Sequence, residues 1–198
     1  MMEDNEHLRL ITVDPGTVTL GFGVIDIDMV TLKPKVIEAF TLDGSVMTRA
    51  WVDTAAGEEA ARQRIMGLNA RLQELFLHYR PDVVSCEDNF LARSPHAFKM
   101  LAEAVAAVRY ALMATLPHSH LYLIPPTEAK KTVNACFKGT GKDDVRQGLK
   151  SYSDLDWGDI SIDMLDEHAV DAIVVGVCMV EKIKAGYELQ SWGTHNNG

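Results

Sequence analysis

Four side chains, Asp14, Glu87, His168 and Asp171, have the types and spacing expected of a site for divalent cations. Asp14 follows the apolar run "LITV" and Glu87 ends the apolar run "VVSCE", so parallel neighbouring strands would bring both carboxylates to one sheet edge. His168 and Asp171 share one face of a predicted helix. Oxygen-rich clusters suit Mg²⁺ or Mn²⁺, and a pair of such ions can activate water and stabilise the leaving oxygen in phosphodiester cleavage.

Each of these residues also has a simpler interpretation. Asp14 precedes a Pro-Gly pair, where Asp is common as a turn former. Glu87, with Asp88 beside it, could end a strand in water, and His168 could lie on the surface of its helix. Asp171 precedes the apolar run "AIVVGVCMV", so it is either a solvated residue near a helix N-terminus or a ligand. No single residue is specific, but the combination in this order favours a shared site.

The elements that would position these residues follow from the hydrophobic pattern. Short β-branched runs bounded by turn residues predict five strands, at 8–13, 20–27, 35–41, 82–88 and 121–124. Apolar periodicity, with Pro and Gly at the boundaries, predicts helices at 58–79, 95–116, 125–137, 143–152 and 164–184. The polar segment 42–57 is predicted to be a loop. This order predicts an α/β fold with a five-stranded mixed sheet flanked by helices on both faces.

Length and composition predict one domain over residues 1–198, with a core at about 8–185 and a polar C-terminal tail at 186–198. Apolar residues make up 47% of the chain and charged residues 24%, which is typical of globular proteins. We find no apolar run long enough to span a bilayer and no signal-like N-terminus, which predicts a cytoplasmic protein with no membrane partner. The three cysteines are far apart, which indicates reduced thiols in or near the core rather than a zinc site.

The net charge of −9 argues against nucleic-acid binding, because phosphate contacts need Lys and Arg. The charges are unevenly placed, however. Lys and Arg outnumber acids in residues 127–150, whereas residues 151–171 are rich in acids and have no Lys or Arg. This polarity fits a metal site beside a phosphate track. It also fits two ordinary solvated faces, and the charge pattern taken alone favours this second interpretation.

Four segments, taken together and in order, resemble the motifs of RuvC-type Holliday junction resolvases, a nuclease family with an RNase H-like fold. They are "ITVDPGTVTLGFGVID", "VSCEDNFLARSPHAFKMLAEAVAAVRYAL", "IPPTEAKKTVNACFKGTGKDDVRQGL" and "DEHAVDAIVVGV". The resemblance covers roughly residues 8–185. Each motif is weak by itself, but four in sequence are specific.

The resemblance implies roles for individual residues. Asp14, Glu87, His168 and Asp171 occupy the family's metal-binding catalytic positions, and both Asp and His occur in the family at the position of His168. The family's basic residues near the scissile phosphate correspond to Lys130 and Lys142, with one extra residue between them in this chain.

The resemblance also implies contacts with DNA. Phe90, three residues after Glu87, matches an aromatic side chain that inserts between bases at the branch point. Its simpler interpretation is a core anchor for its loop, although the match favours the wedge. Further candidates for DNA contact are Arg93, Lys131, Lys138 and Arg146. If the alignment with the family is shifted, Lys131 and Lys138 rather than Lys130 and Lys142 correspond to its basic residues near the scissile phosphate.

The function implied by the resemblance is cleavage of four-way DNA junctions by paired symmetric nicks, with two Mg²⁺ ions per active site and Mn²⁺ as a substitute. Two nicks need two active sites, which implies a homodimer. The dimer surface would be the helix at 95–116, whose apolar residues could equally belong to the core; these are Phe98, Leu101, Ala102, Val105 and residues 108–112. The longer loop at 42–57 and the acidic segment "SDLDWGDISID" depart from the compact bacterial members of the family. Such a version fits a bacterium or a phage, and the expected location is the cytosol of the bacterium or of the phage-infected host.

Three other functions stay open at this stage. An RNase H-like nuclease could act on branched DNA generally or on RNA–DNA hybrids. A non-catalytic nucleic-acid-binding relative is disfavoured because all four cluster residues are retained. An actin-like nucleotide-binding domain begins with a similar strand, Asp-x-Gly turn and strand, but this chain lacks the second half that such a clamp needs. A branch-migration helicase partner is unknown.

Overall fold

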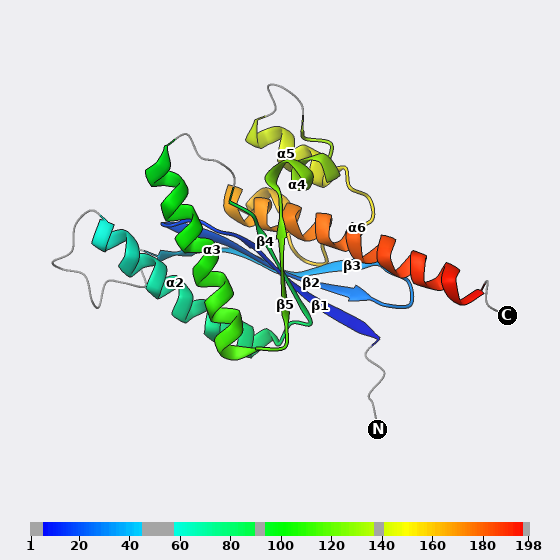
Figure 1. The fold of residues 1–198 in the computed structure, drawn as a ribbon. Helices are drawn as coiled ribbons and strands as arrows, with labels where there is room; N and C mark the ends of the chain where they lie inside the picture. Colours follow the sequence, from blue (N-terminus) through cyan, green and yellow to red (C-terminus); the bar gives the residue numbers. More distant parts are fainter. Residues whose placement is uncertain (1–5, 45–57, 90–93, 137–140, 196–198) are drawn as a thin grey trace.

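The computed structural model describes residues 6–44, 58–89, 94–136 and 141–195, with the backbone alone for 187–195 (Figure 1). The strands are β1 (His7–Asp14), β2 (Thr19–Asp28), β3 (Pro34–Asp43), β4 (Val83–Glu87) and β5 (His120–Ile124). The helices are α2 (Glu58–Tyr79), α3 (Pro95–Thr115), α4 (Pro126–Thr132), α5 (Lys142–Lys150) and α6 (Glu167–His195), with a 3₁₀ turn at Ile162–Met164.

The five strands form one mixed sheet in the order β3-β2-β1-β4-β5. The first three strands pair antiparallel, whereas β1 with β4 and β4 with β5 pair parallel. Val13 of β1 pairs with Cys86 of β4, so the residues that follow, Asp14 and Glu87, lie at the same edge of the sheet. The parallel pairing thus provides the shared edge that the sequence predicted.

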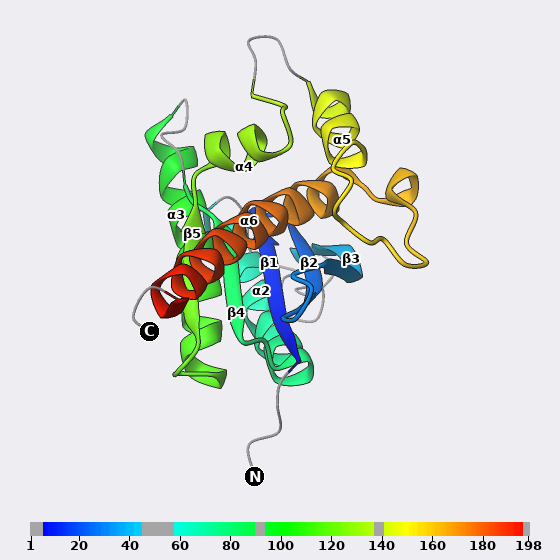
Figure 2. The same ribbon diagram turned by 90° about the vertical axis from the view of Figure 1, so that its right-hand side faces the viewer.

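Helices cover both faces of this sheet (Figures 1 and 2). The long helix α6 crosses one face, where its buried run from Ala172 to Val180 packs on the strands together with α4 and α5. The other face is covered by α2 and α3, whose side chains surround the fully buried Phe22 and Phe76. The predicted α/β architecture, with a five-stranded mixed sheet between helices, is confirmed.

Small residues let α6 approach the strands closely. A Cβ atom added to Gly176 of α6 would lie 2.6 Å from Thr12 Cγ2 of β1. A Cβ atom added to Gly21 of β2 would lie 2.0 Å from the carbonyl oxygen of His168. Such distances are far below van der Waals contact, so only glycine fits at these two positions. The first turns of α6 are thereby placed directly over β1 and β2.

The boundaries of the last helix differ from the prediction. The α6 helix begins at Glu167 rather than 164, because the Asp166 carboxylate accepts a hydrogen bond of 2.9 Å from the N–H of Ala169 and acts as the N-cap. The helix continues to His195, so most of the predicted polar tail is helical. Helix α5 begins and ends slightly earlier than predicted. Most of the predicted loop at 42–57 lies outside the described residues.

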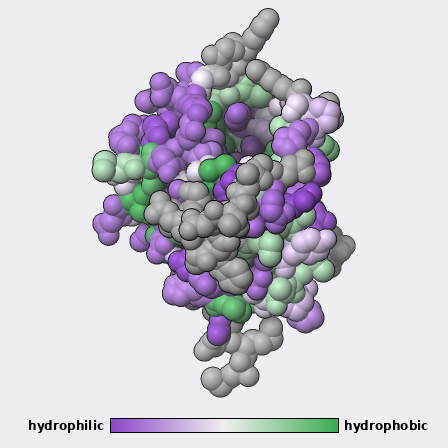
Figure 3. Space-filling model, turned by 90° about the vertical axis from the view of Figure 1, so that its left-hand side faces the viewer, coloured by the Kyte–Doolittle hydropathy of each residue, from purple (hydrophilic) through white to green (hydrophobic). Residues whose placement is uncertain are grey.

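The apolar residues of α3 divide between core and surface. Val105, Val108 and Leu112 are buried in the core on the α2 side, so the core interpretation holds for them. Tyr110 and Met113 stay exposed, at 65% and 60% of their surface. Figure 3 views the molecule from the side at which α2 and α3 begin. The coloured surface on this side is mostly hydrophilic, with separate small hydrophobic patches.

Two features bear on the predicted environment of the protein. Cys86 and Cys178 are buried free thiols, as predicted, whereas Cys136 is exposed. Among the described residues, we find no helix with the length and apolarity needed to cross a membrane.

Candidate active site

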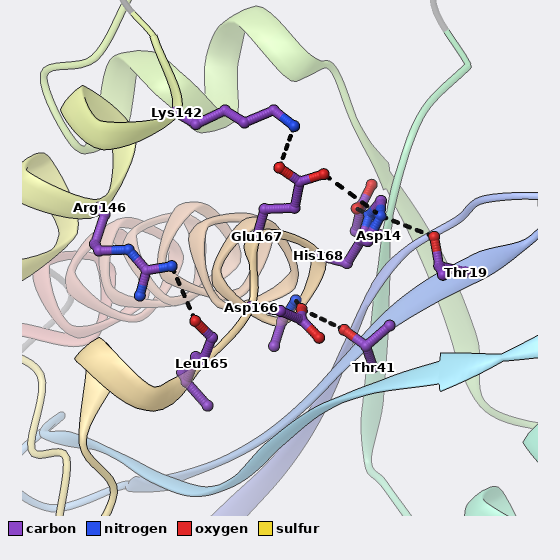
Figure 4. A network of polar contacts seen from close by, with 10 residues as sticks. Asp14, Thr19, Thr41, Lys142, Arg146, Leu165, Asp166, Glu167 and His168 are labelled. Carbon is purple, nitrogen blue, oxygen red and sulfur yellow. Dashed lines mark hydrogen bonds and ion pairs between the residues drawn. The ribbon is translucent and has the colours of Figure 1, made fainter.

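The structure brings the four predicted ligands together at the carboxyl edge of β1 and β4. Asp14 is the last residue of β1, Glu87 is the last residue of β4, and His168 and Asp171 lie in the first two turns of α6. His168 Nδ1 lies 3.1 Å from Asp14 Oδ2 (Figure 4). The negative charge of Asp14 also acts on both Glu87 and Asp171, which places all four side chains in one electrostatic neighbourhood.

Burial and mutual repulsion alter the acidity of two of these carboxyl groups. Burial, reinforced by the charges of Asp14 and Asp171 and by a hydrogen bond with Asp14, raises the pKa of Glu87 to about 8. Burial and the charge of Asp14 raise the pKa of Asp171 to about 6. The ammonium group of Lys130 opposes both shifts, so it lies close to this group of acids. Ionisation of these carboxyl groups is therefore unfavourable in the metal-free site.

His168 is held at both ring nitrogens. Its Nδ1 faces Asp14, and its Nε2 lies 2.8 Å from the hydroxyl oxygen of Thr19 at the start of β2 (Figure 4). The hydrogen bond to Asp14 raises the pKa of the imidazole, against the opposing effect of burial. The ring orientation is thus set by partners from two different strands.

The donor set fits hard divalent cations. Carboxylate oxygens are the ligands that Mg²⁺ and Mn²⁺ prefer, and a cation among these acids would offset the repulsion that raises the pKa values of Glu87 and Asp171. Among the described residues, no group of three or more His, Cys, Asp or Glu side chains is arranged closely enough to hold a metal ion in this conformation. A cation would therefore have to draw the carboxylates inward.

A surface pocket of about 510 Å³ opens beside this cluster. Its walls include Thr19, Lys142, His168 and Asp171, so it leads from solvent to the face of α6 that carries the predicted ligands. The predicted phosphate-contacting Lys142 is the first residue of α5 and forms an ion pair with Glu167 at the start of α6 (Figure 4). This ion pair lowers the pKa of Glu167.

The basic helix α5 is engaged by the acidic segment that follows it. Arg146, predicted to contact DNA, donates a hydrogen bond of 2.9 Å to the carbonyl oxygen of Leu165, just before α6 (Figure 4). Lys150 pairs with Asp163. The basic and acidic stretches of the sequence are therefore in contact across the loop between α5 and α6, through the ion pairs of Lys142 with Glu167 and of Lys150 with Asp163.

Of the remaining residues predicted to contact DNA, the structure describes only Lys131. Lys131 is exposed in the last turn of α4, next to Lys130. Phe90, Arg93 and Lys138 lie outside the described residues.

Sequence reasoning missed Thr19 and Glu167. Thr19 begins the pattern Thr-x-Gly-x-Gly in β2, in which alternate residues share one face and the two glycines lie under α6. That alternation of small residues is a signal that could have identified the strand face next to His168. Glu167 carries no such signal, because its pairing with Lys142 depends on how α5 packs.

Comparison with known proteins identifies the family of this chain. The family model described as crossover junction endodeoxyribonuclease RuvC matches residues 10–179. A RuvC from Caldanaerobacter subterraneus is 28% identical over 171 residues, which cover 86% of this chain and 91% of the relative. A RuvC from Polynucleobacter necessarius is 33% identical over 107 residues, and this match spans 54% of each protein.

Solved structures share the fold at low sequence identity. Thermus thermophilus RuvC, in complex with a Holliday junction substrate, aligns with a TM-score of 0.64 and 19% identity, covering 91% of this chain and 98% of that one. The yeast mitochondrial Holliday junction resolvase Ydc2 aligns with a TM-score of 0.62 and 9% identity, over 87% of this chain and 78% of that one. These similarities confirm the RNase H-like fold, and the match of the family model over residues 10–179 shows that this chain belongs to the RuvC family of crossover junction endodeoxyribonucleases.

Proposed function

We propose that this protein is a metal-dependent endonuclease that resolves four-way DNA junctions by paired symmetric nicks. The observation that carries the proposal is the convergence of Asp14, Glu87, His168 and Asp171 at one sheet edge in a chain of this family. Relatives named as junction endonucleases support the substrate class.

Asp14, Glu87 and Asp171 would hold two Mg²⁺ ions, which Mn²⁺ could replace, with His168 as a further ligand or as a group that orients water. Bound divalent cations supply Lewis acidity towards water and towards phosphate oxygens. Burial, together with the charge of Asp14, raises the pKa values of Glu87 and Asp171, and the ability of a cation to favour the ionised carboxylates is the physical basis for this assignment.

Around that centre, side chains of this chain bind and orient the substrate. Lys130 lies close enough to influence Glu87 and Asp171, so its ammonium group can offset the charge that develops on the scissile phosphate. Lys142, Lys131, Lys138 and Arg93 would contact DNA phosphates, and Phe90 would unstack the bases at the branch point. Arg146 already holds the loop before α6, so its contribution would be to position Lys142.

Two coordinated nicks on a two-fold junction require two active sites, so the proposal includes a homodimer. Helix α3 is the candidate surface because Phe98, Tyr110 and Met113 remain exposed on it after the core is formed. A partner helicase stays outside the proposal.

The test is a nicking assay on a synthetic immobile four-way junction in Mg²⁺, in Mn²⁺ or in chelator. We expect paired symmetric cuts in either metal and no cuts in chelator. A DNA flap and an RNA–DNA hybrid serve as competing substrates. Faster cleavage of the flap or the hybrid than of the junction would contradict the assigned substrate, and cleavage in chelator would contradict the metal requirement.

Substitutions at Lys130 and at its neighbour Lys131 should have different effects on nicking and on DNA binding. We expect Lys130→Gln to lower the rate of the nicking step by about a hundredfold, the loss typical when a group that stabilises transition-state charge is removed. Lys131→Gln, one residue along the same exposed helix end, should act mainly on junction binding and its salt dependence. Single-turnover nicking and gel-shift titrations distinguish the two effects. A larger rate loss for Lys131→Gln would mean that the alignment with the family is shifted by one residue.

The acidic cluster should make the stability of the metal-free protein depend on pH. The folded-state pKa values of Glu87 and Asp171, about 8 and about 6, exceed the ordinary values of 4.5 and 3.8. A carboxyl group whose pKa is raised by folding stabilises the protein fully below its ordinary pKa, and this contribution is lost as pH rises through the folded value. We therefore expect the melting temperature without metal to fall as pH approaches 8.

Mg²⁺ should reverse this loss, because it favours the ionised carboxylates. Thermal unfolding in chelator and in Mg²⁺ across this pH range measures the effect, and the stabilisation by Mg²⁺ should be larger at alkaline than at acidic pH. The variant Glu87→Gln is the matched control, since it should flatten the pH dependence. An equal shift by Mg²⁺ at both ends of the range would contradict cation binding at these carboxylates.

A further inference from the structure

Thr19 makes a contact that the proposed chemistry does not use. It is the first residue of β2, and its Oγ1 lies 2.8 Å from Nε2 of His168. The other ring nitrogen of His168, Nδ1, lies 3.1 Å from Oδ2 of Asp14. In Figure 4 the dashed contacts of the imidazole run to Thr19 and to Glu167, whose Oε1 lies 3.8 Å from Nε2, and the side chain of Asp14 overlaps the ring in this view.

The chemistry of the three groups sets the direction of these hydrogen bonds. An ionised carboxylate accepts hydrogen bonds and cannot donate them, so the Nδ1 atom that faces Asp14 carries a hydrogen. In a neutral imidazole the Nε2 atom is then an acceptor, and the hydroxyl of Thr19 is the group that donates to it. The opposite tautomer would set two acceptors against each other, at Nδ1 of His168 and Oδ2 of Asp14.

We propose that Thr19 is a positioning residue of the active site: its hydroxyl donates a hydrogen bond to Nε2 of His168 and fixes the orientation of the ring, whose Nδ1–H in turn orients the carboxylate of Asp14. This inference rests on the proposed function and deepens it. Both ring nitrogens have protein partners in this arrangement, so the hydrogen bond from Thr19 acts on the site through the position of the His168 ring and of Asp14. A partner that fixes the orientation of a histidine ring in this way is a common support of metal sites.

The surroundings of Thr19 favour an exact placement of the hydroxyl. Thr19 and Gly21 are two residues apart on β2 and therefore point to the same face, the one covered by α6. Gly21 brings the backbone of His168 against the strand, and Thr19 meets the ring of the same residue. Thr19 is half-buried and β-branched, so its side chain has few rotamers to choose from. One strand thus fixes both the backbone and the ring of His168.

A pair of substitutions at Thr19 tests the role of the hydroxyl. Thr19→Val keeps the branched shape and the strand preference but removes the donor, whereas Thr19→Ser keeps the donor. We expect Thr19→Val to lower kcat for junction nicking by about tenfold with KM unchanged, as is typical for loss of a group that supports a ligand. Thr19→Ser should nick at close to the wild-type rate. In a His168→Gln background, Thr19→Val should cause no further loss.

The hydrogen bond from Thr19 to His168 can be measured without metal or DNA. Nitrogen-15 NMR of histidine-labelled, metal-free protein, at a pH well above the pKa of the ring, reports which ring nitrogen carries the hydrogen and whether the other accepts a hydrogen bond, and His168→Gln identifies the signals. We expect the Nδ1–H form in the wild type and in both variants, because Asp14 is retained. The Nε2 signal of Thr19→Val should move to the position of a nitrogen that accepts no hydrogen bond from the protein, whereas Thr19→Ser should keep the wild-type signal.

Two outcomes would overturn the proposal. One is an unchanged Nε2 signal of His168 in Thr19→Val, whatever its nicking rate. The other is an equal loss of rate from Thr19→Val with and without His168, which would mean that Thr19 acts independently of the ring. If the wild-type protein cuts no branched DNA, the proposed function fails, while the NMR comparison still decides whether Thr19 positions His168.

Discussion

The variant Asp14→Asn is expected to lose at least about a hundredfold in the rate of junction nicking while it still binds junction DNA. Replacing a group that merely supports a metal ligand typically costs 10–100-fold, so removal of the charge of a ligand should cost no less. Asn keeps the size of the side chain, and its carbonyl oxygen can still accept the hydrogen bond from His168 Nδ1. The expected loss therefore comes from the missing negative charge rather than from a collapsed site.

The same substitution should make the metal-free protein more stable. The charge of Asp14 is a cause of the raised pKa values of Glu87 and Asp171, so its removal relieves repulsion at the sheet edge. We expect the melting temperature in chelator to rise, and the stabilisation by Mg²⁺ to shrink. Such an opposition between stability and activity is typical of sites that hold like charges together for function.

Asp88 provides the matched control for this experiment. It follows Glu87 at the same sheet edge, and its carboxylate accepts a hydrogen bond from the backbone N–H of Asn89. Asp88→Asn removes an equal charge from the chain, so it should leave the nicking rate near that of the wild type. Comparable activity of Asp14→Asn and Asp88→Asn in single-turnover assays would remove Asp14 from the catalytic centre.

The sequence allowed the convergence of the acids to be predicted because each part of the pattern is local. Asp14 and Glu87 stand where apolar strands end, and His168 and Asp171 have the spacing of one helix face. Parallel pairing of β1 with β4 then brings the two strand ends together. Strand ends and helical spacing are visible in a single sequence, so the outline of the site could be derived before its geometry was known.

The contacts that join distant elements could not be predicted in the same way. The pair of Lys142 with Glu167, and the line from Thr19 through His168 to Asp14, depend on packing between elements far apart in the chain. The start of α6 was placed too early because apolar periodicity ignores the N-cap formed by Asp166. Such boundaries depend on single hydrogen bonds, which the hydrophobic pattern does not contain.

The structure shows where the acidic residues of the chain lie relative to its basic residues. A net charge of −9 argued against DNA binding, yet the acidic segment before α6 pairs with basic residues of its own chain. Lys150 pairs with Asp163, and Lys184 with Asp154. These ion pairs place acids of the segment beside bases of the same chain and leave the net charge at −9, while part of the remaining negative charge belongs to the cluster that a cation would offset.

The second large effect is expected from Gly21→Ala, which should both destabilise the protein and abolish most of its activity. Gly21 pairs with Asp14 across the β1–β2 ladder, and an added Cβ would lie 2.0 Å from the carbonyl oxygen of His168 and 2.5 Å from its carbonyl carbon. Backbone atoms cannot rotate away as a side chain can, so the start of α6 would have to move off the sheet.

That movement acts directly on the active site. His168 would separate from Asp14 and Thr19, and Asp171 would move with it on the same helix. Overpacking of this kind typically costs about 1–3 kcal/mol of stability. A displacement of a catalytic group by about 1 Å can lower the rate roughly a hundredfold. Denaturant unfolding and single-turnover nicking measure the two losses separately.

Two other glycines distinguish this explanation from a general intolerance to alanine. At Gly23, on the same face of β2, an added Cβ would meet two side-chain atoms at 2.6 Å, Ile173 Cδ1 and Thr12 Oγ1, but no backbone atom of α6, so Gly23→Ala should cost less activity than Gly21→Ala. At Gly186 in α6 nothing lies within 4 Å, and Gly186→Ala should stabilise the helix by about 0.5–1 kcal/mol. Equal loss of activity at Gly21 and Gly23 would mean that the close approach of His168 to β2 does not set the geometry of the site.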